Sequence, residues 1–176
     1  MNNIEGLTIR FLNLNHNYDK TYPINKIMEF YDKPEYMIYL WGKRGNGKTI
    51  AVQYYLAKMG QRPKNEGYYT YGKYITMSNL LMELYAGDFS EKVKIVKKYS
   101  EKYFMLVIDE IDKITLTDYK EEMIFNILDN RISNMMYTII SANKSIGELK
   151  DQLGINIISR ILDNAVVIEN KGEVLR

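Results

Sequence analysis

Residues 42–49 read Gly-Lys-Arg-Gly-Asn-Gly-Lys-Thr and match the pattern Gly-x-x-x-x-Gly-Lys-Ser/Thr at each fixed position. They follow directly on an apolar run at residues 36–41. A triphosphate needs several backbone N–H donors that converge on its oxygens, and glycines let the chain curl closely around them. Because four constrained positions are met together, the probability of a chance match is roughly one per cent or less. The octet therefore predicts a phosphate-binding loop rather than an ordinary glycine-rich turn.

The residue types of this loop predict ATP and Mg²⁺ as cofactors. Lys48 is expected to place its charge on the β and γ phosphates, and Thr49 is expected to offer its hydroxyl to Mg²⁺. The helix that begins there would direct the positive end of its dipole at the anion. The predicted nucleotide-binding residues are the octet and the residue after it: Gly42, Lys43, Arg44, Gly45, Asn46, Gly47, Lys48, Thr49 and Ile50.

A second apolar run, at residues 103–108, ends in the adjacent acids Asp109 and Glu110. This pattern suggests a buried parallel strand whose carboxyl end opens on a site. Asp109 is expected to bind Mg²⁺ directly or through water, opposite Thr49, and Glu110 to orient the attacking water as general base. Alone, an Asp-Glu pair could simply open a turn. Together with the loop, it indicates ATP hydrolysis.

Two further polar residues are candidates for the catalytic set. Asn143 follows the predicted strand at residues 135–140, where an open α/β sheet places its ligand crevice, so it could hydrogen-bond the water or the γ phosphate. Arg160 lies among apolar neighbours, which is an odd place for a charge unless it projects toward an anion or an acidic partner. A salt bridge on an amphipathic helix explains Arg160 equally well.

Strands and helices alternate along the chain, which predicts an α/β domain. We expect a P-loop NTPase fold, a three-layer sandwich with a central, mainly parallel five-stranded sheet. The expected strands lie at residues 35–41, 68–77, 103–108, 135–140 and 165–168. Residues 1–35 are expected to form a lead-in that packs on the nucleotide site, before a core at residues 36–176.

Composition narrows the functional classes. The chain has 176 residues, enough for one domain, and 24 basic against 22 acidic residues, so no global charge indicates a nucleic-acid partner. The absence of cysteine excludes disulfides, thiolate zinc sites and cysteine nucleophiles, and fits a cytoplasmic location. No signal-like segment or membrane-spanning stretch occurs. Lysines at residues 92–98 could face a nucleic-acid strand, although a solvated helix face is the commoner explanation.

The motifs together resemble the AAA+ ATPases of the bacterial helicase-loader group, DnaC and DnaI, to which the transposition helper IstB is also similar. The resemblance covers the chain from about residue 36 to the end. It rests on the octet, Leu-Val-Ile-Asp-Glu at 106–110, Thr-Ile-Ile-Ser-Ala-Asn at 138–143, Glu148-Leu149, Leu153-Gly154 and Ser159-Arg160.

The resemblance implies roles that the residues alone do not show. The octet would be Walker A, Asp109 and Glu110 Walker B, and Asn143 sensor 1. Arg160 would be an arginine finger acting on ATP in a neighbouring subunit, so the active unit would be a homo-oligomer with little or no helical lid. Arg131 resembles another family arginine near the subunit interface, and Arg176 falls roughly at the position of the sensor 2 arginine.

The expected function is therefore an ATPase that acts in DNA replication as a helicase-loader-like protein, with single-stranded DNA or a replicative helicase as partner. Helicase loaders commonly carry a second aspartate where this chain has Glu110, and glutamate favours competent hydrolysis. They also have an amino-terminal helicase-binding domain, for which residues 1–33 are too few. The alternatives are an IstB-like transposition helper, a monomeric P-loop small-molecule kinase and a nucleotide-gated adaptor.

Overall fold

The computed structural model describes residues 4–8, 11, 21–61, 71–86 and 88–174. Its centre is one six-stranded sheet with the order β1-β3-β4-β5-β2-β6, in which every pair of neighbours is parallel. The strands are β1 (Ile4–Glu5), β2 (Met37–Gly42), β3 (Gly72–Thr76), β4 (Met105–Asp109), β5 (Tyr137–Ala142) and β6 (Val166–Asn170). The α/β P-loop fold class is thus confirmed, with one strand more than expected.

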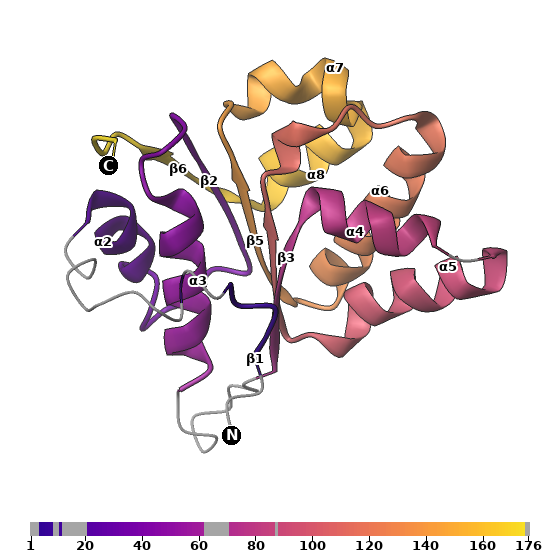
Figure 1. Ribbon diagram of the computed structural model, residues 1–176, viewed down its shortest axis with the longest axis horizontal. Helices are drawn as coiled ribbons and strands as arrows, with labels where there is room; N and C mark the ends of the chain where they lie inside the picture. Colours follow the sequence, from indigo (N-terminus) through magenta and orange to yellow (C-terminus); the bar gives the residue numbers. More distant parts are fainter. Residues whose placement is uncertain (1–3, 9–10, 12–20, 62–70, 87, 175–176) are drawn as a thin grey trace.

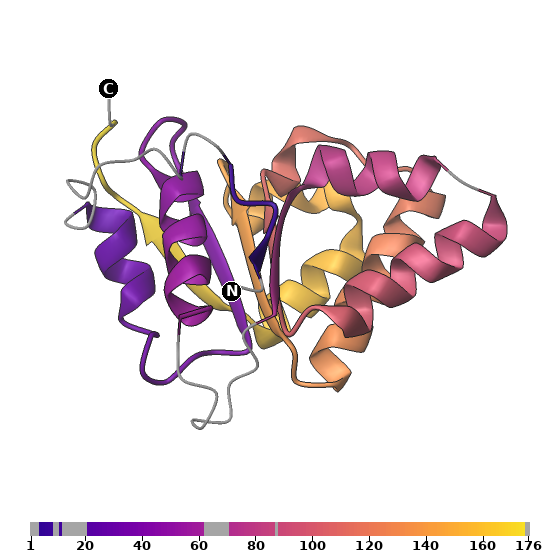
Figure 2. The same ribbon diagram turned by 60° about the horizontal axis from the view of Figure 1, so that its bottom comes forward.

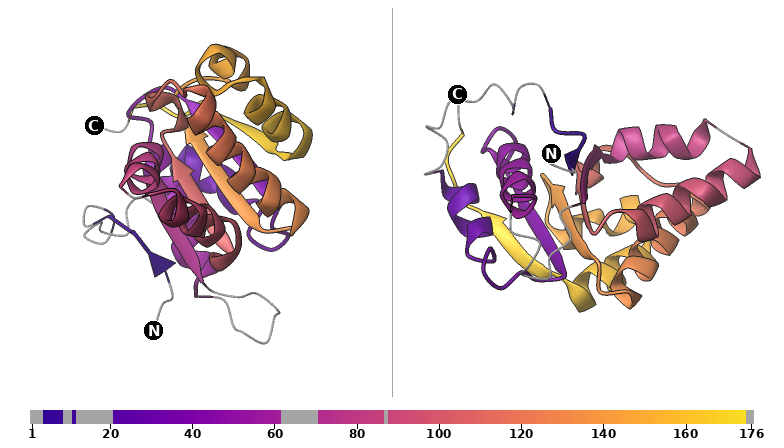
Figure 3. Two further views of the ribbon diagram at one scale, coloured as in Figure 1. Left: turned by 90° about the vertical axis from the view of Figure 1, so that its right-hand side faces the viewer. Right: turned by 90° about the horizontal axis from the view of Figure 1, so that it is seen from below.

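Helices cover both faces of the sheet (Figures 1 and 2). The α-helices are α2 (Tyr22–Met28), α3 (Lys48–Met59), α4 (Met77–Tyr85), α5 (Phe89–Lys97), α6 (Asp118–Ser133), α7 (Lys150–Leu153) and α8 (Ile155–Asn164). The described residues also form three short helical segments, the π-helix η3 (Lys98–Lys102) and the 3₁₀ helices η4 (Ile111–Lys113) and η5 (Ile146–Leu149). Seen from below, α2 and α3 lie on one side of the strands and the remaining helices on the other (Figure 3).

Helices cover both faces of the sheet, and successive residues of a strand point to opposite faces. Side chains of both sets are therefore buried. On β2, Tyr39 packs into the core beneath α4, α6 and α8, whereas the next residue, Leu40, packs beneath α2 and α3. On β4, Ile108 and Val107 divide in the same way. This explains why the central strands β2, β4 and β5 are mostly apolar. Because all pairs are parallel, the carboxyl ends of the strands lie at one edge of the sheet.

The additional strand lies in the segment that the sequence predicts as a lead-in. β1 pairs with β3, with Ile4 opposite Gly72 and Glu5 opposite Lys73. A strand of two residues has no alternating pattern, so nothing in the local sequence identifies it. In the same segment, α2 packs on α3 through Ile24 and Ile27.

Arg131 lies inside the molecule rather than on its surface. Its side chain is fully buried near the end of α6, where it donates to backbone carbonyls and to the hydroxyl of Thr138. The resemblance placed this arginine near a subunit interface, whereas its side chain has no exposed surface here. Its role here is to bind the core together.

Candidate active site

The predicted phosphate-binding loop joins β2 to α3 at the carboxyl edge of the sheet, and in Figure 1 it lies at the same end as the loop after β5. Three of its glycines, Gly42, Gly45 and Gly47, have a positive φ. Gly47 has φ of 86°, and Gly42 has φ of 152° and so close a neighbour that a Cβ there would lie 2.5 Å from the carbonyl oxygen of Asn170. The backbone conformation of the loop therefore depends on glycine at these positions.

Lys48, the first residue of α3, is buried in this loop with 7% of its surface exposed. Its Nζ donates to the carbonyl oxygens of Gly42 at 2.6 Å and Lys43 at 2.8 Å. It also donates to Oδ1 of Asn46 and Oδ1 of Asn143, both at 3.2 Å. Burial lowers the pKa of Lys48, while the nearby carboxylates, Asp109 foremost, oppose that shift. The structure thus joins the loop to Asn143 through the lysine ammonium.

Asp109 ends β4 and is almost fully buried at 2% exposure. Oδ2 accepts from the hydroxyl of Tyr74 at 2.7 Å. Oδ1 accepts from the backbone N–H of Glu110 at 2.9 Å and from the hydroxyl of Ser141. Burial, followed by the charge of Asp109, raises the pKa of Tyr74, so the phenol stays protonated as a donor. The carboxylate is therefore held in one orientation.

The residues present fit a magnesium ion. Mg²⁺ prefers hard oxygen ligands and usually takes one or two carboxylates together with waters and substrate phosphates. Oδ2 of Asp109 accepts one hydrogen bond and keeps a further acceptor direction, and Thr49 provides a hydroxyl on the first turn of α3. Among the described residues, no group of three or more His, Cys, Asp or Glu side chains could hold a metal. A site shared with phosphate oxygens does not need such a group.

Glu110 follows Asp109 in a left-handed backbone conformation, with φ of 57° and ψ of 45°. This conformation is uncommon for residues other than glycine and often marks a functional constraint. The Glu110 side chain is 44% exposed, and Oε1 lies 3.7 Å from Nζ of Lys113. The backbone turn thus leaves a half-exposed carboxylate directly beside the buried one.

Asn143, directly after β5, is held by a residue that the sequence did not single out. Oδ1 of Asp112 accepts from the backbone N–H of Asn143 at 3.1 Å, and Oδ2 accepts from its Nδ2 at 3.0 Å. Asp112 lies in η4, shortly after the Asp-Glu pair. An acidic residue in a short turn belongs to no helical or strand pattern. Its position two residues after Glu110 was the one signal in the sequence that pointed to it.

Asn170, at the end of β6, is a second residue that the sequence analysis missed. Its Nδ2 donates to the carbonyl oxygen of Asn46 at 2.9 Å, and Nδ2 of Asn46 donates to the carbonyl oxygen of Asn170 at 3.0 Å. Both side chains are buried. This reciprocal pair fastens the loop to the last strand and explains why Asn46 can also present Oδ1 to Lys48.

Arg160 lies on α8, in the helical layer. Its Nε is 2.7 Å from Oδ1 of Asp129 on α6, and its guanidinium lies over the ring of Phe125, 5.3 Å from the centroid. The side chain is 41% exposed. Within the described part of the chain, its recorded contacts do not reach the phosphate-binding loop, Asp109, Glu110 or Asn143.

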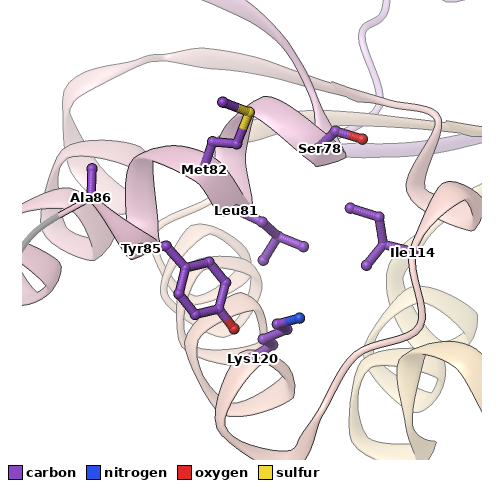
Figure 4. A pocket seen from close by; sticks show the side chains of 7 residues that line it. All are labelled: Ser78, Leu81, Met82, Tyr85, Ala86, Ile114 and Lys120. Carbon is purple, nitrogen blue, oxygen red and sulfur yellow. The ribbon is translucent and has the colours of Figure 1, made fainter.

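The other predicted positions are less constrained. Lys43 and Arg44 are exposed, Thr49 and Ile50 are half-buried, and Arg176 lies outside the described residues. A separate pocket of about 440 Å³ opens between α4, Ile114 and Lys120. Figure 4 shows the side chains that line it: Ser78, Leu81, Met82, Tyr85, Ala86, Ile114 and Lys120. None of these is a predicted site residue, so this mostly apolar pocket is distinct from the site.

Sequence comparison gives one family match. The family described as IstB-like ATP binding protein matches residues 25–176. No curated protein matches the chain. In the part of the chain that the structure describes, no helix has the length and apolar character needed to cross a membrane.

Solved structures share the fold at low sequence identity. The DnaC helicase loader superposes with a TM-score of 0.69 at 23% identity, covering 93% of this chain and 100% of that one. DnaI gives 0.68 at 20% identity, covering 94% and 89%. The replication initiator DnaA bound to AMPPCP and single-stranded DNA gives 0.68 at 15% identity and covers 84% of this chain. This chain spans less than half of that initiator, 44% of its length.

Proposed function

Because the chain belongs to the family of IstB-like ATP binding proteins, we propose that it is an AAA+ ATPase that converts ATP and water to ADP and phosphate. We propose further that it serves DNA replication in the manner of a helicase loader. The observation that carries the proposal is the convergence of Lys48, Asp109, Glu110 and Asn143 at the carboxyl edge of the sheet. We propose the same domain organisation as the sequence predicts, with residues 36–176 as the ATPase core and residues 1–35 as a lead-in.

The proposed roles follow from the chemistry of each group. Lys48, freed from the loop carbonyls, would bind the β and γ phosphates, with residues 42–50 around the nucleotide. Bound Mg²⁺, held by Thr49 and Asp109, would neutralise phosphate charge. Glu110 would accept the proton of the attacking water, because its carboxylate is half-exposed beside the buried acid. Asn143, with its amide oxygen toward Lys48, would accept a hydrogen bond from that water and so orient it.

Arg160 is assigned to a neighbouring subunit's site, which makes the active unit a homo-oligomer. The contacts of Arg160 with Asp129 and Phe125 form the helix-surface salt bridge that the sequence offered as the alternative. The assignment therefore rests on the family resemblance and on the 41% exposure of the side chain, which leaves it accessible to a second subunit. In a single chain the guanidinium lies against Asp129 at 2.7 Å and does not reach the ATP site of its own subunit. An isolated subunit is therefore expected to turn over ATP slowly, because no arginine stabilises the charge that develops in the transition state.

Single-stranded DNA and a replicative helicase are the proposed partners, in the cytoplasm. Most lysines of α5 and η3 already have a partner within the chain. Lys98 pairs with Glu83 at 3.0 Å and Lys97 with Glu101 at 3.9 Å, and Nζ of Lys92 lies over the ring of Tyr119. Lys94, exposed on α5, is thus the residue of this cluster most available to a phosphate.

An IstB-like transposition helper is the second candidate, and the family match favours it. Both candidates use the same ATP site, so they differ only in the partner that assembly serves. Stimulation of turnover by a replicative helicase would support the loader, and stimulation by a transposase with duplex DNA would support the helper.

The test of the ATPase proposal compares wild type with Lys48→Ala, using Lys150→Ala on α7 as an exposed-lysine control. Phosphate release is measured with and without single-stranded DNA, together with particle mass by light scattering. We expect Lys48→Ala to abolish turnover and ATP binding, while Lys150→Ala behaves as wild type. Turnover that survives Lys48→Ala contradicts the proposal. A wild-type monomer whose phosphotransfer depends on an added small-molecule acceptor would indicate the kinase alternative.

A further inference from the structure

The orientation of the Asn143 amide is set by Asp112. A carboxamide can present either its oxygen or its NH₂ group, and nothing intrinsic to asparagine chooses between them. Here Asp112 accepts two hydrogen bonds from Asn143, from the backbone N–H at 3.1 Å and from Nδ2 at 3.0 Å. A carboxylate offers only acceptors, so the NH₂ group must face Asp112. Oδ1 is thereby directed to Nζ of Lys48, at 3.2 Å.

Asp112 is itself held by buried and hydrogen-bonded neighbours. Ile111 beside it is fully buried and anchors η4 to the core. The side chain of Gln152 donates to the carbonyl oxygen of Asp112 at 3.4 Å and accepts from Nζ of Lys144 at 2.6 Å. The hydroxyl of Tyr39 donates to the carbonyl oxygen of Lys144 at 2.7 Å. The turn that carries Asp112 and the segment that carries Asn143 are therefore fastened to each other.

We propose that Asp112 is a positioning residue for ATP hydrolysis, which fixes the Asn143 amide with its oxygen toward Lys48 and free to accept a hydrogen bond from the attacking water. The proposal rests on the proposed function, because it assigns Asp112 a role through Asn143. With the opposite amide orientation, the NH₂ group would face the Lys48 ammonium, donor against donor. That contact is repulsive, and it would remove the acceptor that aligns a water or the lysine.

Asp112→Asn tests this with almost no change of side-chain volume. The new amide can present its oxygen to the backbone N–H of Asn143, but its NH₂ group then faces the NH₂ group of Asn143. If the new amide turns over, its NH₂ group faces the backbone N–H instead, so one of the two hydrogen bonds that hold Asn143 is lost in either orientation. We expect kcat to fall about 10- to 100-fold, as a misplacement of about 1 Å can cost that much. The KM for ATP, the affinity for ADP and the melting temperature should change little, because the loop that binds the nucleotide is untouched.

Three further measurements separate positioning from general stabilisation. Asp151→Asn, an exposed aspartate on α7, is the matched control and should leave kcat unchanged. In a double-mutant cycle, Asp112→Asn should add little to the loss caused by Asn143→Ala, because both act through one amide. The Nδ2 proton resonances of Asn143 should shift in Asp112→Asn and stay in place in Asp151→Asn.

The outcomes are distinguishable. An unchanged kcat in Asp112→Asn, independent additive losses in the double-mutant cycle, or unmoved Asn143 resonances would each overturn the inference. A joint fall of kcat, ADP affinity and melting temperature would instead assign Asp112 a purely structural role. If wild type shows no turnover in any assembly, or Lys48→Ala matches it, the ATPase proposal fails. The resonance shift still decides whether Asp112 orients Asn143 in that case.

Discussion

At the scale of single residues, two arginines of this chain have opposite surroundings. Arg131 is fully buried, and all three of its guanidinium nitrogens donate, to Thr138 Oγ1 and to carbonyl oxygens that include those of Tyr99 and Tyr103. Burial lowers its pKa to about 9, so the cation persists at neutral pH. Arg160 is 41% exposed and faces a carboxylate. The first serves the core, and the second forms an ion pair at the surface.

Replacing Arg131 is therefore expected to destabilise the chain strongly. Arg131→Met keeps the apolar stem but removes the guanidinium donors from several buried carbonyls, at about 1–3 kcal/mol for each group left unsatisfied. We expect the free energy of unfolding in urea to fall by about 3 kcal/mol or more. Arg131→Lys, which restores one ammonium, should lose less. The exposed Arg160→Ala is the control, and a loss at Arg131 no larger than in that control would contradict the account.

The residues of the candidate site were predictable from the sequence, but their hydrogen-bond partners were not. Lys48, Asp109, Glu110 and Asn143 could be singled out because each belongs to a motif at the end of a strand. The residues that hydrogen-bond them could not be singled out, since each hydrogen bond joins residues far apart in the chain. Tyr74 and Asp109 are 35 positions apart, Asp112 and Asn143 are 31 apart, and Asn46 and Asn170 are 124 apart. Such pairs exist only once the sheet has brought the strand ends together.

At the scale of elements, long strands were predictable and the short edge strand was not. The central strands β2, β4 and β5 carry the apolar runs that burial on both faces requires, whereas β3 and β6 are marked by β-branched and aromatic residues. β1 consists of Ile4 and Glu5 alone, and its anchor is polar. Glu5 accepts hydrogen bonds from the hydroxyls of Tyr71 and Tyr103, and lies 3.7 Å from Nζ of Lys73. Tertiary contacts rather than strand propensity therefore hold this element in place.

The anchor of β1 predicts a pH dependence of stability. The hydrogen bond from Tyr71 is the largest cause that lowers the pKa of Glu5, from 4.5 to about 2. A carboxyl whose pKa is lowered on folding contributes stability above its unfolded pKa, and this contribution is lost as the pH falls from about 4.5 toward 2. Urea midpoints of wild type and Glu5→Gln should thus differ most at pH 7 and converge below pH 4.5. Glu173→Gln is the exposed control. A difference that stays constant with pH would contradict the assignment.

At the scale of the whole molecule, the predicted catalytic residues divide between two regions. Lys48, Asp109 and Asn143 meet at the carboxyl edge of the sheet, whereas Arg160 lies on α8 against α6. A single chain thus has one region with the phosphate-binding loop and its acids, and another in which Arg160 is half-exposed beside Asp129. Under the proposed function, two copies complete one site.

Mixing of two inactive variants tests this division directly. Glu110→Gln should bind ATP without hydrolysing it and still supply Arg160, whereas Arg160→Ala keeps an intact site without the arginine. If Arg160 acts in a neighbouring site, a mixture should regain turnover that neither variant shows alone, with a maximum near equal amounts. The double variant Glu110→Gln/Arg160→Ala, which supplies neither group, should not rescue Arg160→Ala. Phosphate release that merely averages the two single variants would show that Arg160 does not act between subunits.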